Sequence, residues 1–138
     1  MTHWIAVISR EHARIAVCSH VLQVCHGKAA PLHRTKAGDE VFIYCPRERM
    51  GAGTMLKRIE FRCTFDDDRI YQIEQAPGFN PFRKDVTFDT GFEEMAIHDV
   101  ARLELTTNPH WGMLARRGFF EISPQDTELL RAHGRVPA

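Results

Sequence analysis

Short apolar runs separated by turn-forming residues follow one another along the chain, and their periods predict a mixture of strands and helices. Strands are expected at about 3–8, 40–45, 70–74 and 82–88, and alternation at the end of 55–63 predicts a further half-buried strand. Amphipathic spacing over 10–19 predicts a short helix with Ser9 as its N-cap. Strands and turns recur at the spacing of a small antiparallel sheet or barrel.

Proline, glycine and aspartate mark the expected boundaries of these elements. Pro46 is expected to end the strand 40–45, so the charged, glycine-containing segment 47–53 is interpreted as a mobile loop. Residues 66–68 are expected to form a hairpin turn, and 76–81 a second turn. Capping residues and matching glycines predict two helices near the carboxyl end, over about 107–118 and 123–134.

Length and charge restrict the class of protein. A chain of 138 residues is the size of one domain, and we expect residues 1–138 to form a single one. Lys plus Arg and Asp plus Glu balance at 18 each, so the net formal charge is zero. The molecule as a whole therefore lacks the positive charge of proteins that bind nucleic acid without regard to sequence. Any contact with a polyanion requires a local basic patch.

Cysteine usage and hydropathy predict a cytoplasmic protein without a membrane role. The four cysteines lie far apart with no C-x-x-C spacing, which favours reduced thiols. No apolar run approaches the roughly 18 residues needed to span a bilayer. Glycine patterns of nucleotide-binding loops are absent, and no cysteine or histidine pair has the usual zinc-ligand spacing. We expect neither a cofactor nor a metal ion.

The two tryptophans are the most informative aromatic residues. Trp4 opens the first strand, and Trp111 precedes the arginine pair Arg116 and Arg117. Aromatic planes beside guanidinium groups are suited to holding a flat base, although on composition alone large aromatics more often fill a core. Trp111 is the better candidate for a pocket wall, because the proline, histidine and glycine around it indicate a helix start near the surface.

Six ordered segments carry a resemblance to a known family. They are Trp4-Ile5-Ala6-Val7-Ile8-Ser9-Arg10-Glu11-His12, Val24-Cys25-His26-Gly27-Lys28-Ala29-Ala30-Pro31-Leu32, Lys36-Ala37-Gly38-Asp39, Tyr44-Cys45-Pro46, Pro77-Gly78-Phe79-Asn80-Pro81-Phe82-Arg83 and the stretch from Trp111-Gly112 to Ile122. In this order and spacing, which cover nearly the whole chain, they resemble the EVE domain, a member of the PUA-like superfamily related in shape to YTH and ASCH domains. One departure is Cys63, where members often carry a glycine in the third strand, and the larger side chain would narrow the pocket floor.

The resemblance implies an α+β fold of PUA-like type: a small, curved, antiparallel or mixed β-barrel flanked by short helices. It also implies a reader of nucleic acid that accommodates a modified base of DNA or RNA in an aromatic pocket, and no catalysis. The residues expected to line that base pocket are Trp4, Ser9, Cys25, His26, Gly27, Lys28, Tyr44, Phe82 and Trp111. Contacts to the phosphate backbone are expected from Lys28, Arg34, Arg83, Arg116 and Arg117.

Two other classes of function stay open at this point. The same pocket suits a sensor of a free nucleoside or another planar small molecule, for which binding would be insensitive to salt. An enzyme acting on a nucleobase or thioester through Cys25 is the weaker alternative, because adjacent Cys and His side chains seldom face each other and no nucleophile turn accompanies them.

Overall fold

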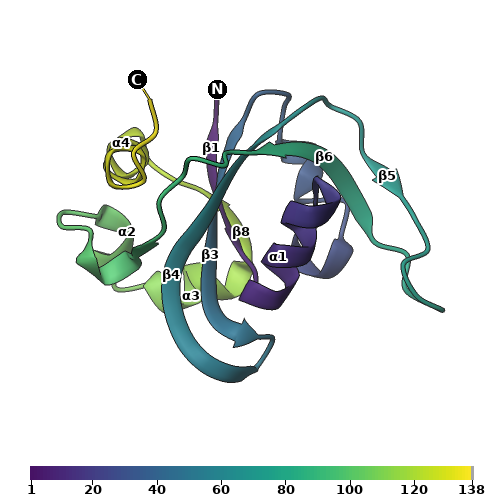
Figure 1. Ribbon diagram of the computed structural model, residues 1–138, viewed down its shortest axis with the longest axis horizontal. Helices are drawn as coiled ribbons and strands as arrows, with labels where there is room; N and C mark the ends of the chain where they lie inside the picture. The colour runs from purple at the N-terminus through teal and green to yellow at the C-terminus, as the bar shows by residue number, and fades with distance from the viewer. Residues whose placement is uncertain (138) are drawn as a thin grey trace.

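The computed structural model describes residues 1–137, and a curved mixed β-sheet runs through its centre (Figure 1). The strands in sheet order are β2 (Val21–Leu22), β6 (Phe82–Phe88), β4 (Ala52–Phe65), β3 (Glu40–Arg49), β1 (His3–Val7) and β8 (Phe119–Glu121). Two short strands, β5 (Tyr71–Gln72) and β7 (Met95–Ala96), pair with β6 and β4. Strands β1 and β3 are parallel, and the other pairs are antiparallel. The predicted curved mixed sheet flanked by short helices is confirmed.

Both faces of the central strands are buried, which explains why β1 and β3 are nearly continuous apolar runs. Trp4 and Val41 belong to one core cluster, whereas their neighbours Ile5 and Phe42 belong to a second cluster on the opposite face. The helices are α1 (Arg10–Ser19), α2 (Glu104–Thr107), α3 (Trp111–Arg117) and α4 (Pro124–His133), with the 3-10 turns η1 (Cys25–Gly27), η2 (Leu32–Arg34) and η3 (Ile97–Asp99). Helix α1 packs on the first cluster, and α2 to α4 pack on the second (Figure 1).

Local capping explains where the longer helices begin and end. Ser9 has extended backbone and its hydroxyl accepts a hydrogen bond from the amide of His12 at 3.4 Å, so it caps α1 as predicted. Ser123 caps α4 in the same way through the amide of Asp126, at 3.1 Å. Gly118, with a φ of 80°, ends α3 at the predicted residue.

The helix expected from residue 107 onward begins later than predicted. Helix α2 ends at Thr107, and α3 starts only at Trp111. Between them the side-chain oxygen of Asn108 accepts a hydrogen bond from the amide of His110 at 2.8 Å. This local turn competes with helical hydrogen bonding and leaves Pro109 outside the first turn of α3.

The strand that was expected to stop at Pro46 continues, and the mobile loop predicted over 47–53 is wrong. Strand β3 runs to Arg49 and pairs with β4 to the end, forming a long hairpin. The pairing register shifts between Cys45 and Arg47, so an irregularity in the ladder accommodates the missing amide hydrogen of Pro46. We call residues 46–57 the arm; it curves away from the sheet at the bottom of Figure 1.

Residues 66–68 do not form the hairpin turn expected between β4 and the strand at 70–74. Strand β4 pairs instead with β6, and β5 is reduced to two residues beside β6. The second expected turn is present, because the carbonyl of Phe79 accepts hydrogen bonds from the amides of Gln75 and Ala76. Residues 73–81, which we call the excursion, extend beyond the sheet on the right of Figure 1.

Asp39 ties the amino end of the chain to the start of β3. Its carboxylate accepts hydrogen bonds from the amides of Thr2 and Lys36, each at 3.0 Å, and from the Trp4 indole at 3.1 Å. Burial by itself would raise the pKa of this carboxyl, but the three hydrogen bonds outweigh it and the pKa lies below the ordinary value. The ionised carboxylate therefore stabilises the fold.

Replacing Asp39 by asparagine is expected to lower the free energy of unfolding by about 2 to 3 kcal/mol near neutral pH, because charge-assisted hydrogen bonds are lost. Because the pKa of Asp39 is lower in the folded than in the unfolded protein, the ionised carboxylate stabilises the fold at pH values above the unfolded pKa of 3.8. This stabilisation is lost as the pH falls through the folded-state pKa. Urea unfolding from about pH 6 downward should thus show a smaller acid-induced loss in Asp39→Asn than in the parent. The exposed Asp99→Asn variant is the control, and equal acid profiles for all three proteins would contradict this account.

Candidate functional site

A cavity of about 900 Å³ opens at the end of β1, between the arm and the excursion. Its walls come from segments far apart in the sequence: one side of α1, η1, the tip of the arm, the excursion and the end of α3. The volume lies in the upper part of the range of small-molecule sites, which is about 300 to 1,000 Å³. Because five separate segments converge here, only the folded chain forms this site.

Positive charge dominates the lining of the cavity. Six cationic side chains face it, against the single carboxylate of Glu74. The six are Lys28, Arg47, Arg49, Arg83, Arg116 and Arg117. A concave surface lined by one sign of charge concentrates ligands of the opposite sign, so this cavity favours anions although the chain has no net charge.

Among the described residues, these six cations have no carboxylate partner, unlike five arginines elsewhere in the protein. Within residues 1–137, none of the six forms an ion pair, whereas Arg10, Arg58, Arg62, Arg131 and Arg135 each pair with a carboxylate. Where hydrogen bonds are present at the cavity, they involve neutral groups: Arg83 donates to the Gln75 amide oxygen at 3.0 Å and Arg47 to the Gly53 carbonyl at 3.3 Å. The cavity cations are therefore available to an external anion.

Apolar side chains are exposed in the same cavity. Ile15, Met50, Ile73 and Phe79 line it with exposed fractions of 55%, 59%, 37% and 39%. Phe79, at the tip of the excursion, is the aromatic member of this group. Exposed apolar surface beside free cations is the combination that holds a planar base next to a phosphate.

The η1 loop forms one wall of the cavity, and its backbone has an uncommon conformation. Cys25, His26 and Gly27 all have positive φ values, of 48°, 60° and 83°. Gly27 also lies against the excursion, because a Cβ on it would stand 2.5 Å from Pro81 Cβ and 2.8 Å from Pro81 Cα. Glycine is needed here both for its φ and for this close approach.

Replacing Gly27 by alanine is expected to destabilise the protein by roughly 2 to 4 kcal/mol, combining left-handed strain with overpacking against Pro81. Gly38→Ala is the matched control, since Gly38 has a φ of 84° and no atom lies within 4 Å of the position that its added Cβ would occupy. Urea unfolding of both variants separates the two costs. Equal losses in the two variants would show that the contact with Pro81 contributes nothing.

The Cys25 thiol is held in its neutral form. Its Sγ donates a hydrogen bond to the carbonyl of Arg117 at 3.1 Å. Burial raises the pKa of this thiol above its ordinary value, against the opposing effect of Lys28 and Arg34. A catalytic cysteine requires the thiolate, so this environment disfavours the cysteine-dependent enzyme.

The structure brings together part of the predicted site. Lining the cavity are the predicted residues Ser9, Cys25, His26, Lys28, Arg83, Arg116 and Arg117. Ser9 is there because the strand β1 ends at the cavity, and the arginine pair because α3 ends there. Arg83 faces the cavity while its neighbour Phe82 packs into the first core cluster, as alternation along β6 requires.

The predicted aromatic walls lie elsewhere. Trp4 is 2% exposed and stacks on Phe119, with ring centroids 4.8 Å apart. On the opposite face of the sheet, Tyr44 belongs to the second core cluster, and the partly buried Trp111 packs edge to face against it, with ring centroids 5.3 Å apart. Burial of large apolar rings outweighs the local pattern around Trp111, so these three rings present no surface to the cavity.

Three further residues also lie outside the cavity lining. Gly27 is buried beneath the excursion, and the Arg34 guanidinium lies over the Trp4 ring at 5.0 Å. Cys63, expected to narrow the pocket floor, is fully buried in β4 next to Val41 of β3. Its size therefore affects core packing and not the cavity.

Several lining residues were not predicted from the sequence. Arg47, Arg49 and Met50 belong to the arm, which was interpreted as a loop. Phe79 lies inside one of the segments that carry the family resemblance, and an aromatic residue directly after a turn glycine is the sequence pattern that indicates it. His12 and Ile15 are three residues apart and share one face of α1. This face mixes polar and apolar residues, so the sequence pattern does not mark it as a cavity wall.

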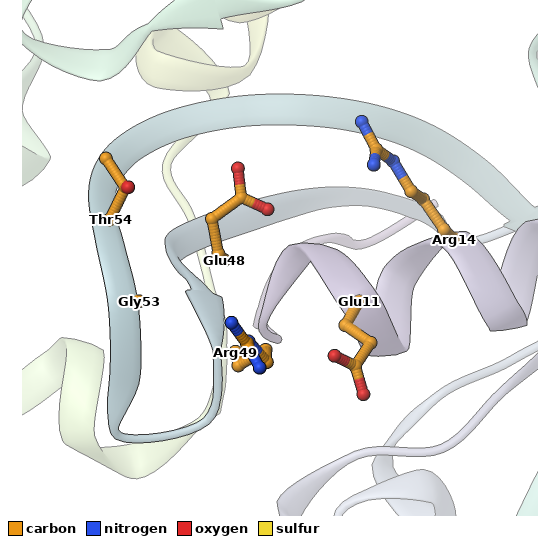
Figure 2. Close-up of a pocket in the computed structure, with 6 residues that line it drawn as sticks. All are labelled: Glu11, Arg14, Glu48, Arg49, Gly53 and Thr54. Atoms are coloured by element: carbon orange, nitrogen blue, oxygen red, sulfur yellow. The ribbon is translucent and has the colours of Figure 1, made fainter.

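A second, smaller pocket of about 460 Å³ lies on the other side of the arm. Figure 2 shows its lining between α1 and the arm, formed by Glu11, Arg14, Glu48, Arg49, Gly53 and Thr54. Acidic and basic side chains are balanced there. Among residues 1–137, no three His, Cys, Asp or Glu side chains gather so as to hold a metal ion, and no helix is long and apolar enough to cross a membrane.

Comparison with known families agrees with the geometry of the sheet. The sequence model that describes the EVE domain family matches residues 2–133. The chain belongs to the EVE domain family. This EVE domain thus has the PUA-like fold that its six sequence segments implied.

Relatives of this EVE domain occur in several bacteria. It is 35% identical over 123 residues to a UPF0310 protein of Streptococcus mutans, covering 87% of each chain. It is 34% identical over 126 residues to the UPF0310 protein YdcG of Bacillus subtilis, covering 90% of this chain and 86% of the relative. The names of these relatives state no activity or ligand.

Solved structures show the same fold at low sequence identity. Rpa0253 of Rhodopseudomonas palustris aligns with a TM-score of 0.67 at 12% identity, covering 100% of this chain and 96% of that one. A hypothetical protein of Leishmania major aligns with a TM-score of 0.62 at 11% identity, covering 98% and 96%. At such identities the likeness establishes the architecture alone.

Proposed function

We propose that this EVE domain binds nucleic acid at the cavity and accommodates one unstacked, modified base there without catalysing a reaction. The observation that carries the proposal is the set of six cations around the cavity, none of which has an ion-pair partner within residues 1–137. A free neutral ligand would leave these charges without a function. A strand of nucleic acid supplies phosphates on both sides of the bound base.

The apolar lining supports the placement of the base. Phe79 projects from the excursion with 39% of its surface exposed, and Ile73 lies on the same wall. Stacking on an aromatic ring is worth about 1 to 3 kcal/mol per base and tolerates any base identity. Specificity then requires polar groups at the base edge and the shape of the pocket.

Amide groups provide such an edge on the same wall. The side-chain amides of Gln23 and Gln75 lie within hydrogen-bond distance of each other, at 2.8 Å. Arg83 donates to the Gln75 side-chain oxygen at 3.0 Å and faces the Gln23 amide as well. Amide side chains can both donate and accept, which is the pattern that reads base edges. A cavity of about 900 Å³ also leaves room for a substituent on the base.

Titration against oligonucleotides tests this proposal. DNA and RNA strands carrying one methylcytosine, one methyladenine or only unmodified bases would be measured at several salt concentrations, together with the free nucleosides. The proposal expects binding that weakens as salt increases and that differs between modified and plain strands. Salt-insensitive binding of a nucleoside alone would favour a small-molecule sensor and contradict the proposal.

Replacing Phe79 by alanine is expected to weaken binding of the preferred strand by roughly 5- to 150-fold, because a stacking contact is lost. Folding should be unaffected, since the side chain is partly exposed at the end of the excursion. Met113→Ala is the control: Met113 is 58% exposed on α3 but lies outside the cavity lining. Fluorescence anisotropy showing equal affinity for both variants would exclude Phe79 as the stacking surface.

A further inference from the structure

The arm is a β-ribbon and not a loop, and ion pairs of Arg10 tie its base to α1. The Arg10 guanidinium donates to both carboxylate oxygens of Glu60, at 2.8 and 2.9 Å, and to Glu48 at 2.7 Å. Glu60 is 6% exposed, so this contact lies inside the protein. The hydrogen bond to Glu60 raises the pKa of Arg10, which keeps the guanidinium charged. The base of the arm is thus fixed to α1, and the tip lies beside the cavity.

The two sides of the arm have different chemistry. Glu48 lines the smaller pocket (Figure 2) and pairs with Arg10, whereas Arg47 and Met50 line only the large cavity. Arg49 lines both. Alternation along β3 accounts for the opposite sides of Arg47 and Glu48, whereas Met50 lies in the turn that follows the strand. At the tip, Met50 is 59% exposed and is followed by Gly51. The arm therefore presents an apolar tip, with arginines before it, at the rim of a cavity suited to one base.

An extruded base leaves a gap in the duplex that has to be filled or the base returns to the stack. Proteins that unstack bases insert apolar side chains such as methionine between base steps, with arginine or lysine on the flanking backbone. Methionine suits this role because its unbranched, polarizable side chain adapts to irregular spaces. Met50 with Arg47 and Arg49 has this combination.

We propose that the arm inserts Met50 into double-stranded nucleic acid, in the place left by the base that enters the cavity. The inference rests on the proposed function, and it names the target as a duplex whose base pair is opened by the protein. Arg47 and Arg49 contact the phosphates beside the opened step. The opposite rim, with Lys28 and Arg117, holds the backbone of the extruded nucleotide.

A matched pair of methionines tests the proposal. Met50→Ala removes the apolar side chain at the tip of the arm. Met55→Ala removes the side chain of another methionine of the arm, which is 55% exposed and lies outside the cavity lining. Binding of both variants and the parent would be measured with a DNA strand bearing one methylcytosine in three forms. The forms are the single strand, its full duplex, and a duplex whose complement lacks the opposite base.

Met50→Ala is expected to weaken binding of the full duplex on the order of tenfold more than binding of the single strand, which meets Met50 only as part of the cavity lining. The duplex without the opposite base should show a smaller loss, since its pair is already open, and Met55→Ala should behave as the parent. Equal effects of the two variants on the duplex, or an equal loss on the single strand, would overturn the role of the arm. Binding of the parent to single strands alone would overturn this inference and leave the proposed function intact, whereas binding to no form would overturn both.

Discussion

Replacing Arg116 and Arg117 together by glutamine is expected to weaken nucleic-acid binding by roughly 50- to 100-fold at about 0.1 M salt. Both guanidinium groups line the cavity at the end of α3, and neither has an ion-pair partner among the described residues. Each phosphate contact contributes about 0.9 to the slope of log affinity against log salt on duplex DNA, so that slope should fall by about 1.8. Modified and plain strands should lose affinity alike, because a phosphate contact does not sense the base.

The control for this loss is a double variant with the same change in charge. Arg58 and Arg135 pair with Glu94 and Glu93, at 3.3 and 3.1 Å, and both lie outside the cavity lining. Arg58→Gln with Arg135→Gln should leave affinity within about twofold of the parent. Neither arginine lines the cavity, so only the long-range electrostatic field changes, and salt screens it. If both double variants lose affinity equally, the net charge and not the cavity determines binding.

Replacing Trp4 by alanine is expected to lower the free energy of unfolding by about 3 to 5 kcal/mol, the cost of removing a large buried aromatic side chain. Trp4 is 2% exposed, stacks on Phe119 with an angle of 12° between the rings, and donates its indole hydrogen to Asp39. Urea unfolding measures this loss. The Trp4→Phe variant keeps most of the apolar contact, so its free energy of unfolding should fall clearly less than that of Trp4→Ala.

Binding by the folded fraction of Trp4→Ala provides the second readout. Because the Trp4 ring presents no surface to the cavity, this fraction should discriminate modified from plain strands as the parent does. A loss of unfolding free energy below about 1 kcal/mol would contradict the core role, since surface substitutions cost that little. If the variant is as stable as the parent but no longer distinguishes modified from plain strands, Trp4 lines the base pocket after all.

Short-range patterns predicted the elements whose hydrogen bonds close within a few residues. Ser9 and Ser123 cap their helices through amides three residues away, and Gly118 ends α3 through its own φ. These contacts depend on local residue types alone. The failures have long-range causes: strand β3 continues past Pro46 because β4 supplies a partner strand, and β4 pairs with β6 instead of the next strand in sequence.

The family resemblance extended the prediction to the architecture but only partly to the site. Ordered segments across the chain predicted a curved mixed sheet with flanking helices, which the structure and the family match confirm. Their glycines and lysine predicted the η1 loop that the structure places at the cavity. They did not reveal which face of the sheet each aromatic ring would occupy, and so Phe79 lines the cavity where Trp111 was expected.

The sequence by itself determined the helix caps, the alternation of the strands and the zero net charge, because each depends on residue type and near neighbours. Only the tertiary structure decided which charges cancel. Arg10 meets Glu60 across 50 residues of sequence, while Arg83, Arg116 and Arg117 meet no carboxylate within residues 1–137. Ion pairing depends on separations of a few ångströms that the sheet and its crossovers create, and so a chain with no net charge acquires one strongly basic cavity.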